Sequence, residues 1–143
     1  MKKPLTPHGP GFSFIDDVEI LEKGRSLRAV KWLDPAAPFF CDHFPEMPLM
    51  PAVLLAEAAA QAAGKLWASV HGQEKPQPYV LAQIERFRVK RNALPGQTLE
   101  IRVVLEKDFG ALARFQAGVK VKDIDIAEGV IILGTLQEVV DES

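Results

Sequence analysis

Residues 41–64 read CDHFPEMPLMPAVLLAEAAAQAAG, and this stretch determines how the rest of the chain is interpreted. Its first half is a proline-rich loop that carries one histidine, His43. Its second half consists mainly of Ala, Leu and Val, which predicts a helix that begins with Pro51 and closes near Gly72. A helix that is apolar around most of its circumference is normally buried on all sides. One carboxylate, Glu57, interrupts it.

The segments on either side of this helix favour strands. Two short candidates, at 12–21 and 24–33, precede it with a turn between them, and the five prolines of residues 34–51 predict loop. Four longer candidates follow at 79–91, 98–108, 111–122 and 128–139, with a hairpin at 108–110. This order predicts a single α+β domain, an antiparallel sheet wrapped around one central helix. We expect the domain to span residues 14–143, after an extended arm at residues 1–13.

Composition excludes several classes of protein. The chain has 143 residues, a formal net charge of −2 and one cysteine, Cys41. General attraction to nucleic acid or to an anionic membrane is therefore not expected, and an internal disulfide framework is excluded. The N-terminus has no apolar signal region, and no apolar run is long enough to span a bilayer. These features predict a cytoplasmic protein.

Glu57 and His43 are the residues that suggest chemistry. A carboxyl group in an apolar helix, facing a histidine, is suited to proton transfer, because one group gives a proton and the other takes it. A structural interpretation stays open: Glu57 lies on a wet stripe of the helix or caps a backbone group with Gln61 one turn away, and His43 is a surface residue. Catalysis by Cys41 is disfavoured because no orienting groups accompany it. His8 and His71 make no metal-like spacing, so no metal site is expected.

The stretch FFCDHFPEMPLMPAVLLAEAAAQAAG resembles the signature of the hotdog-fold (3R)-hydroxyacyl-acyl-carrier-protein dehydratases of fatty-acid synthesis. The family pattern reads approximately F-F-x-G-H-F-P-x-x-P-x-M-P-G-V-L-x-x-E-A-x-A-Q. The resemblance extends over residues 14–139 and includes a long strand with an L-P-G turn. The residues in register with the pattern are Phe39, Phe40, His43, Phe44, Pro45, Pro48, Met50, Pro51, Val53, Leu54, Glu57, Ala58, Ala60 and Gln61.

This resemblance implies a function and roles for the residues. His43 would remove the C2 proton of a 3-hydroxyacyl thioester, and Glu57 would protonate the departing hydroxyl to leave a trans-2-enoyl thioester. The two residues would meet across the interface of a homodimer or a higher even oligomer. The substrate would be carried on the phosphopantetheine of acyl carrier protein or on coenzyme A, with no other cofactor. The expected substrate-binding residues are Phe44, Pro51, Ala52, Val53 and Gln61, with helix amides near Ala52 and Val53 polarising the thioester carbonyl.

Two positions depart from the family pattern. Asp42 replaces the glycine before the histidine, and Ala52 replaces the glycine after the Met-Pro pair. Both departures indicate a divergent member, in fatty-acid synthesis or in a polyketide or polyene pathway. They also keep open a non-catalytic acyl-binding subunit of a heterodimer. A hotdog thioesterase is a third possibility, although the intact His-Phe-Pro loop argues against it.

A basic run follows in the strand candidate at 79–91. Arg86, Arg88 and Lys90 lie at alternate positions with Arg91 beside them, which predicts a basic stripe on one strand face. Such a stripe is either a solvated surface or a docking site for an acidic carrier protein. Nucleic-acid binding is disfavoured because no aromatic residues interleave with the charges.

Overall fold

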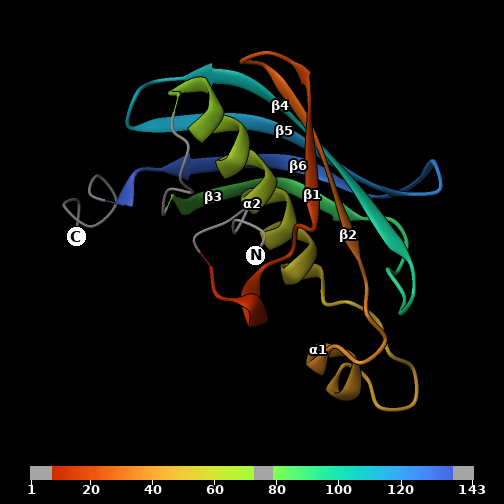
Figure 1. Ribbon diagram of the computed structural model, residues 1–143. Helices are drawn as coiled ribbons and strands as arrows, with labels where there is room; N and C mark the ends of the chain where they lie inside the picture. The colour runs from red at the N-terminus through yellow and green to blue at the C-terminus, as the bar shows by residue number, and fades with distance from the viewer. Residues whose placement is uncertain (1–7, 73–78, 137–143) are drawn as a thin grey trace.

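The structure, a computed structural model, describes residues 8–72 and 79–136 and confirms one antiparallel sheet wrapped around a single long helix (Figure 1). The sheet has six strands in the order β1-β2-β4-β5-β6-β3, so β1 and β3 are its edges. The elements in chain order are a 3-10 turn η1 (Pro10–Phe12), β1 (Asp17–Glu22), β2 (Ser26–Trp32), α1 (Pro38–Asp42), α2 (Ala52–Val70), β3 (Val80–Val89), β4 (Thr98–Asp108), β5 (Leu112–Val121) and β6 (Ile124–Gly134).

Helix α2 forms the centre of the core. Its alanines at positions 58, 59, 62 and 63 are all 0% exposed, and side chains this small let the sheet backbone approach the helix closely. Leu66 and Trp67 fill the space near its C-terminal end and are also fully buried. Pro51 is the N-cap rather than the first helical residue, so the helix begins one residue later than predicted. Gly72 closes it with a φ of 68°, which glycine adopts without steric cost.

The long strands follow the predicted alternation. In β5, Ala113, Phe115, Ala117, Val119 and Val121 are buried against α2 and the residues between them are more exposed. The predicted hairpin between β4 and β5 is present, and Gly110 supplies its positive φ of 86°. Strand β6 lies inside the sheet, between β5 and β3, which explains why its middle is apolar on both faces.

Three local features differ from the sequence-based expectation. The proline-rich loop contains the five-residue helix α1, which starts at Pro38, where a missing N–H costs nothing. Within the predicted N-terminal arm, Pro10–Phe12 form a 3-10 turn, residues 1–7 lie outside the described residues, and the domain boundary remains a prediction. Strand β3 has register shifts against β6 between Leu81 and Gln83 and between Glu85 and Arg88, which a regular strand would lack. No described helix has the length and hydropathy to cross a membrane.

Candidate active site

His43 is held in one orientation by the loop that connects α1 to α2. It is the C-cap of α1, and its backbone N–H donates to the Phe39 carbonyl at 3.1 Å. Its ring Nδ1 lies 3.2 Å from the carbonyl oxygen of Leu49. Because a carbonyl oxygen only accepts hydrogen bonds, Nδ1 is the donor in this contact, and the neutral imidazole then carries its lone pair on Nε2. The ring of Phe44 stacks on the imidazole with a centroid separation of 4.3 Å.

Glu57 projects from the second turn of α2 and is partly buried, with 22% of its side chain exposed. Its Oε2 accepts a hydrogen bond of 3.0 Å from Nε2 of Gln61, one turn further along the helix. The two residues lie at the i, i+4 spacing at which side chains on a helix meet. Glu57 is neither unpaired nor fully desolvated, so it stays accessible to a substrate.

Gln61 connects Glu57 to the N-terminal segment through side-chain hydrogen bonds. It is 5% exposed, and its Nε2 also donates to the Phe12 carbonyl at 2.8 Å, while its Oε1 accepts from the Phe14 N–H at 2.8 Å. Both amide hydrogens and the carbonyl oxygen are thus bonded within the protein. The role of Gln61 in substrate binding stays a prediction, and its hydrogen bond to Glu57 favours a role in positioning that carboxyl group.

His8 is a neighbour of Glu57 that the sequence did not indicate. Its Nε2 lies 3.8 Å from Glu57 Oε2, and its ring packs on Phe12 at a centroid separation of 5.6 Å. The contact joins residues 49 positions apart in sequence, so no local pattern signals it. Among the described residues, no group of three His, Cys, Asp or Glu side chains is arranged to hold a metal ion.

The N-terminal end of α2 presents the remaining predicted binding residues. Ala52 and Val53 are exposed, Val53 by 74%, and their backbone N–H groups have no hydrogen-bond partner within the described chain. Such free amides at the positive end of a helix dipole attract a developing negative charge. Phe44 is also exposed, by 52%, and Pro51 leads into the helix.

The two departures from the family pattern introduce no backbone strain. Neither Asp42 nor Ala52 has a positive φ; the described non-glycine residues that do are Arg86, Lys122 and Asp123. Asp42 ends α1 with an exposed side chain, and neighbouring Cys41 is an exposed free thiol. Side chains at both positions are accommodated without the left-handed conformation that would require glycine.

His43 and Glu57 are not joined within this chain. Across the described ranges, no hydrogen bond or ion pair links them, and each has other partners. The segment with α1 and His43 projects from the sheet beside the start of α2 (Figure 1). Within the described residues, the two side chains are therefore held by separate sets of contacts.

The third histidine, His71, belongs to a different cluster at the far end of α2. Its Nε2 lies 3.3 Å from Oδ2 of Asp108, which also accepts a hydrogen bond of 3.0 Å from the buried Trp67 indole. Tyr79 stacks on Trp67, and burial, with the Asp108 charge as a second cause, raises the pKa of its hydroxyl. The cluster fastens the C-terminal end of α2 to the β4–β5 hairpin.

Solved structures of low sequence identity show the same fold. One is the dehydratase heterocomplex ApeI:P from Xenorhabdus doucetiae, with a TM-score of 0.79 at 15% identity, covering 97% of this chain and 94% of that one. Another is the F36A mutant of the fluoroacetyl-CoA-specific thioesterase FlK, with a TM-score of 0.64 at 13% identity, covering 87% of this chain and 96% of that one. These likenesses confirm the hotdog fold and do not separate the chemistries that it supports.

Sequence comparison is more specific. The FabA-like domain model matches residues 6–130. The 3-hydroxyacyl-acyl-carrier-protein dehydratase FabZ of Klebsiella pneumoniae subsp. pneumoniae is 39% identical over 129 residues, 90% of this chain and 82% of that protein. FabZ of Salmonella arizonae matches to the same extent, with 39% identity over 129 residues. The chain therefore belongs to the family of FabA-like domain proteins.

Proposed function

We propose that this protein dehydrates 3-hydroxyacyl thioesters, carried by acyl carrier protein, to trans-2-enoyl thioesters in fatty-acid synthesis. Its FabZ relatives, 39% identical over 90% of the chain, are dehydratases of this substrate by name. The observation that carries the proposal is the orientation of His43, whose Nδ1 contact with the Leu49 carbonyl leaves Nε2 free as a base. The partly exposed Glu57 supplies the matching acid.

The reaction needs only two proton transfers. His43 Nε2 takes the C2 proton, and the electrons of the broken C2–H bond form the C2–C3 double bond. The C3–O bond breaks as Glu57 transfers its proton to the leaving oxygen, which departs as water. The atoms balance without an oxidant, a reductant or a metal ion. Afterwards the imidazolium and the carboxylate exchange their proton through solvent and restore the starting state.

The start of α2 is suited to hold the thioester. Removal of the C2 proton places negative charge on the thioester carbonyl oxygen, which needs hydrogen-bond donors that are already oriented. The unpaired N–H groups of Ala52 and Val53 are such donors, and the helix dipole adds to their effect. The methyl group of Ala52 leaves the backbone N–H of the same residue available for this role.

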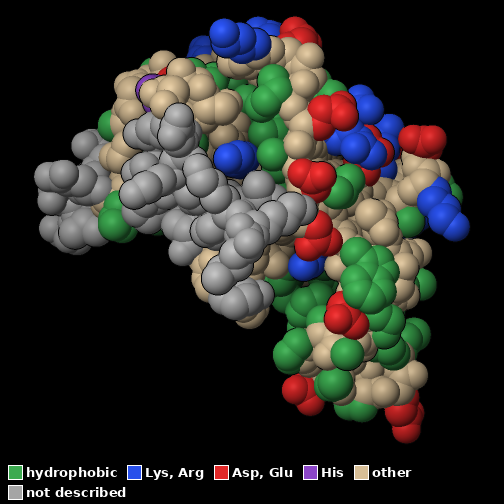
Figure 2. Space-filling view, viewed as in Figure 1, with side chains coloured by type: hydrophobic (Ala, Val, Ile, Leu, Met, Phe, Trp, Pro, Cys, Tyr) green, Lys and Arg blue, Asp and Glu red, His purple; other side chains and the backbone are tan. Residues whose placement is uncertain are grey.

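We propose that the complete site forms between two copies of the chain, with His43 from one and Glu57 from the other. No hydrogen bond or ion pair joins the two residues within the described chain, and each is partly exposed. Apolar side chains gather on the projecting segment that carries His43 (Figure 2), where Phe44 is 52% and Met47 65% exposed. Exposed apolar side chains of this size typically mark a surface that a partner covers.

The test is the ultraviolet absorbance of the enoyl thioester, with purified protein and a 3-hydroxyacyl pantetheine thioester. We expect absorbance to rise with the wild type and not with His43→Ala or Glu57→Ala, each checked for folding by circular dichroism. Release of free thiol without enoyl absorbance would identify a thioesterase instead. Ligand binding without turnover, in a folded oligomer, would identify a non-catalytic acyl-binding subunit.

A further inference from the structure

An N-terminal segment, residues 8–15, lies against α2 beside Glu57. The side chain of Gln61 holds this segment at two points, the Phe12 carbonyl and the Phe14 N–H, each at 2.8 Å. Phe14 and Ile15 are buried in the core, with 5% and 4% of their surface exposed. The segment is therefore fixed to the helix by hydrogen bonds and by apolar packing, and a side chain that it carries near Glu57 has a defined place.

Aromatic rings extend this anchoring to His8. The His8 imidazole packs on Phe12 at a centroid separation of 5.6 Å, and Phe12 packs on Phe14 at 5.1 Å. Phe14 in turn packs on Phe39 of α1 at 6.3 Å. Aromatic pairs at such separations are favourable contacts. Because the residues between His8 and Phe12 are Gly-Pro-Gly, with little side chain to pack, these ring contacts help to hold the imidazole in position.

His8 faces one particular oxygen of Glu57. Its Nε2 lies 3.8 Å from Oε2, the oxygen that also accepts the 3.0 Å hydrogen bond from Gln61. Among the residues that the structure describes, no hydrogen bond or ion pair is made to the other oxygen, Oε1. One oxygen of the carboxyl group is thus turned to the protein, and the other is left for a substrate. With 32% of its side chain exposed, His8 is also in contact with solvent.

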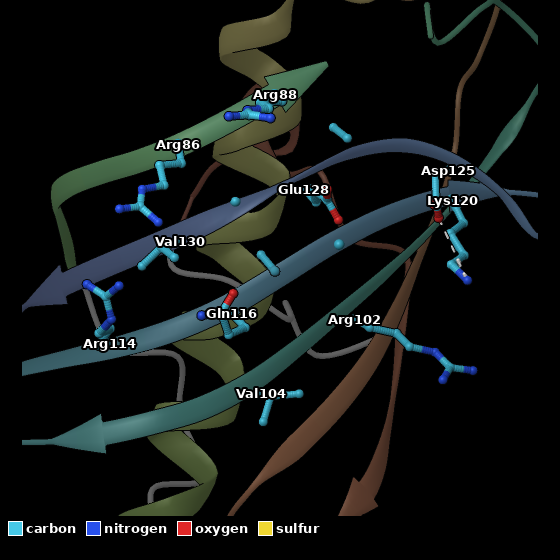
Figure 3. A pocket seen from close by; sticks show the side chains of 14 residues that line it. Arg86, Arg88, Arg102, Val104, Arg114, Gln116, Lys120, Asp125, Glu128 and Val130 are labelled. Carbon is cyan, nitrogen blue, oxygen red and sulfur yellow. Dashed lines mark ion pairs between the residues drawn. The ribbon is translucent and has the colours of Figure 1, made fainter. Parts of the chain in front are cut away.

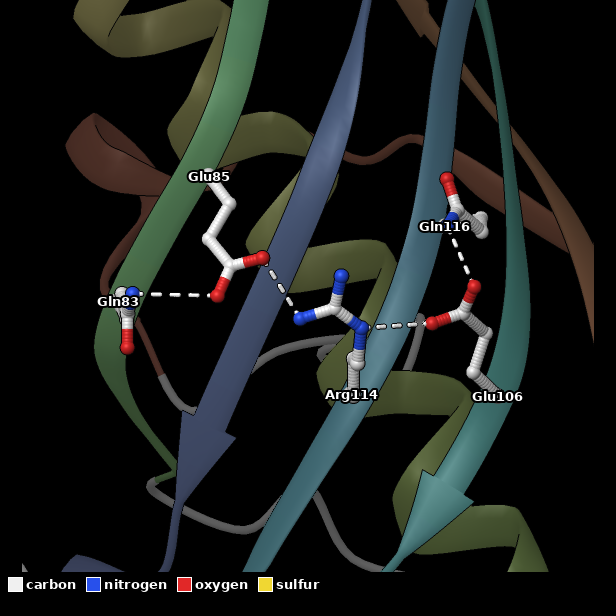
Figure 4. A network of polar contacts seen from close by, with 5 residues as sticks. All are labelled: Gln83, Glu85, Glu106, Arg114 and Gln116. Carbon is white, nitrogen blue, oxygen red and sulfur yellow. Dashed lines mark hydrogen bonds and ion pairs between the residues drawn. The ribbon is translucent and has the colours of Figure 1, made fainter.

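The large basic cluster of the molecule lies on the other side of the sheet from α2. There Arg114 is held between Glu85 and Glu106, at 2.7 Å from a carboxylate oxygen of each (Figure 4). Figure 3 shows the basic side chains of this face in front of the sheet, with α2 behind it. Within the described ranges, His8 is the one ionisable side chain that pairs with Glu57. The basic residues of the opposite face are Arg86, Arg88, Arg102, Arg114 and Lys120.

The dehydration proposed above needs a proton on Glu57 in every turnover. A glutamic acid side chain in water keeps its proton in about one molecule in 500 at pH 7, whereas an imidazole keeps its proton in about one in four. A histidine beside the carboxyl group can therefore hold a proton at neutral pH and transfer it when the reaction needs it. The amide of Gln61 contacts the same oxygen but has no proton to give up at this pH.

We infer that His8 holds the proton that Glu57 delivers to the leaving oxygen; this inference rests on the proposed function. The Nε2–H bond of the imidazolium breaks, the proton passes to Oε2 of Glu57, and the electron pair stays on Nε2. Rotation of the carboxyl group about its last bond, a soft torsion, turns the proton toward the substrate. The proton that His43 releases to solvent is replaced by one that His8 takes from solvent, so the cycle balances.

His8 acts through Glu57 and is therefore a positioning residue rather than a catalytic one. Direct transfer requires the 3.8 Å separation to shorten by about 1 Å, and contacts of this kind tighten when a substrate binds. The anchoring at Gln61 and Phe12 keeps the imidazole close enough for such a movement.

The test measures steady-state rates at pH 7 with a 3-hydroxyacyl pantetheine thioester, for wild type, His8→Ala and His8→Gln. We expect kcat to fall about 10- to 100-fold in both variants, from the difference in proton occupancy between imidazole and carboxyl groups. KM should stay within about twofold, because His8 does not hold the thioester. Glutamine keeps a side-chain N–H donor for Oε2 but cannot transfer a proton, so a merely structural contact would survive His8→Gln.

Imidazole added to the assay supplies the missing group. It should raise the kcat of His8→Ala several-fold and leave the wild type unchanged. The control is His71→Ala, which removes a histidine that pairs with a carboxylate, Asp108 at 3.3 Å, at the other end of the same helix. This variant should keep the kcat of wild type and should not respond to imidazole. Circular dichroism verifies that every variant is folded at the assay temperature.

The outcomes separate the inference from the proposed function. Variants of His8 with the kcat of an active wild type would overturn the inference and leave the dehydratase standing. A loss in His8→Ala that His8→Gln restores, or that imidazole does not relieve, would also overturn it, because His8 would then act as a structural contact. A wild type without turnover would refute the dehydratase proposal, and this inference with it.

Discussion

Replacing Gln61 by Met should damage stability and catalysis together. Methionine keeps the length and volume of the side chain but removes all three hydrogen bonds of the amide. The buried Phe14 N–H loses its acceptor, which costs about 1–3 kcal/mol, and loss of the bond to the Phe12 carbonyl adds about 1 kcal/mol. We therefore expect Gln61→Met to lower the free energy of unfolding by roughly 2–4 kcal/mol and Tm by roughly 5–15 °C.

The same change releases Glu57 from its donor at 3.0 Å. Because a displaced acid meets the leaving oxygen less often, kcat should fall about 10- to 100-fold in the fraction that stays folded. The assays are thermal unfolding by circular dichroism and enoyl-thioester absorbance at a temperature where both proteins are folded. Gln83→Met, which removes an exposed glutamine from β3, is the control and should change stability by less than about 0.5 kcal/mol. A Gln61→Met protein with the Tm and kcat of wild type would show that the Gln61 hydrogen bonds neither stabilise the fold nor position Glu57.

Two further substitutions test packing and charge in the sheet. Gly129→Ala should lower the free energy of unfolding, measured in urea, by about 1–3 kcal/mol, because the new methyl group would lie 2.6 Å from the Phe87 Cα atom. The control Gly118→Ala has open space around it and should leave the free energy of unfolding unchanged or raise it. Equal losses in the two variants would contradict the steric argument. Hydrogen bonds from Gln116, the larger cause, and from Arg114 hold the pKa of Glu106 below its usual value. The Glu106 carboxylate therefore contributes fully to stability above about pH 4.3, and this contribution is lost as pH falls through the lowered pKa. The stability deficit of Glu106→Gln should accordingly be present at pH 7 and shrink below about pH 4; a deficit independent of pH would contradict the charge argument.

Regular elements were predictable because their patterns are local. The alternation from Leu99 to Leu105 and from Ala113 to Val121 identified two central strands, and the apolar run after Pro51 identified the core helix. Each pattern repeats over several turns or residues, so burial on one face is visible in the sequence alone. The contact between Glu57 and Gln61 is equally local, because the two residues lie one helical turn apart.

Features that depend on distant residues were not predictable. The bulge at Arg86 arises because Gly129, far along the chain, lets Phe87 pack closely, and no pattern within β3 signals it. Gln61 reaches the N-terminal segment across 47 and 49 residues, and His8 reaches Glu57 across a similar separation. Helix α1 was not predicted because it starts at Pro38, in a segment whose prolines predict loop.

Complementation between inactive variants tests the shared active site most directly. His43→Ala and Glu57→Gln, each inactive alone, are coexpressed so that their subunits mix. A mixed dimer pairs the intact His43 of one subunit with the intact Glu57 of the other at one of its two sites. We predict recovery of about a quarter of wild-type activity, since random mixing makes half of the dimers mixed. A mixture as inactive as its components, with mixed dimers verified by mass spectrometry, would contradict the account and place both residues in a site within one chain.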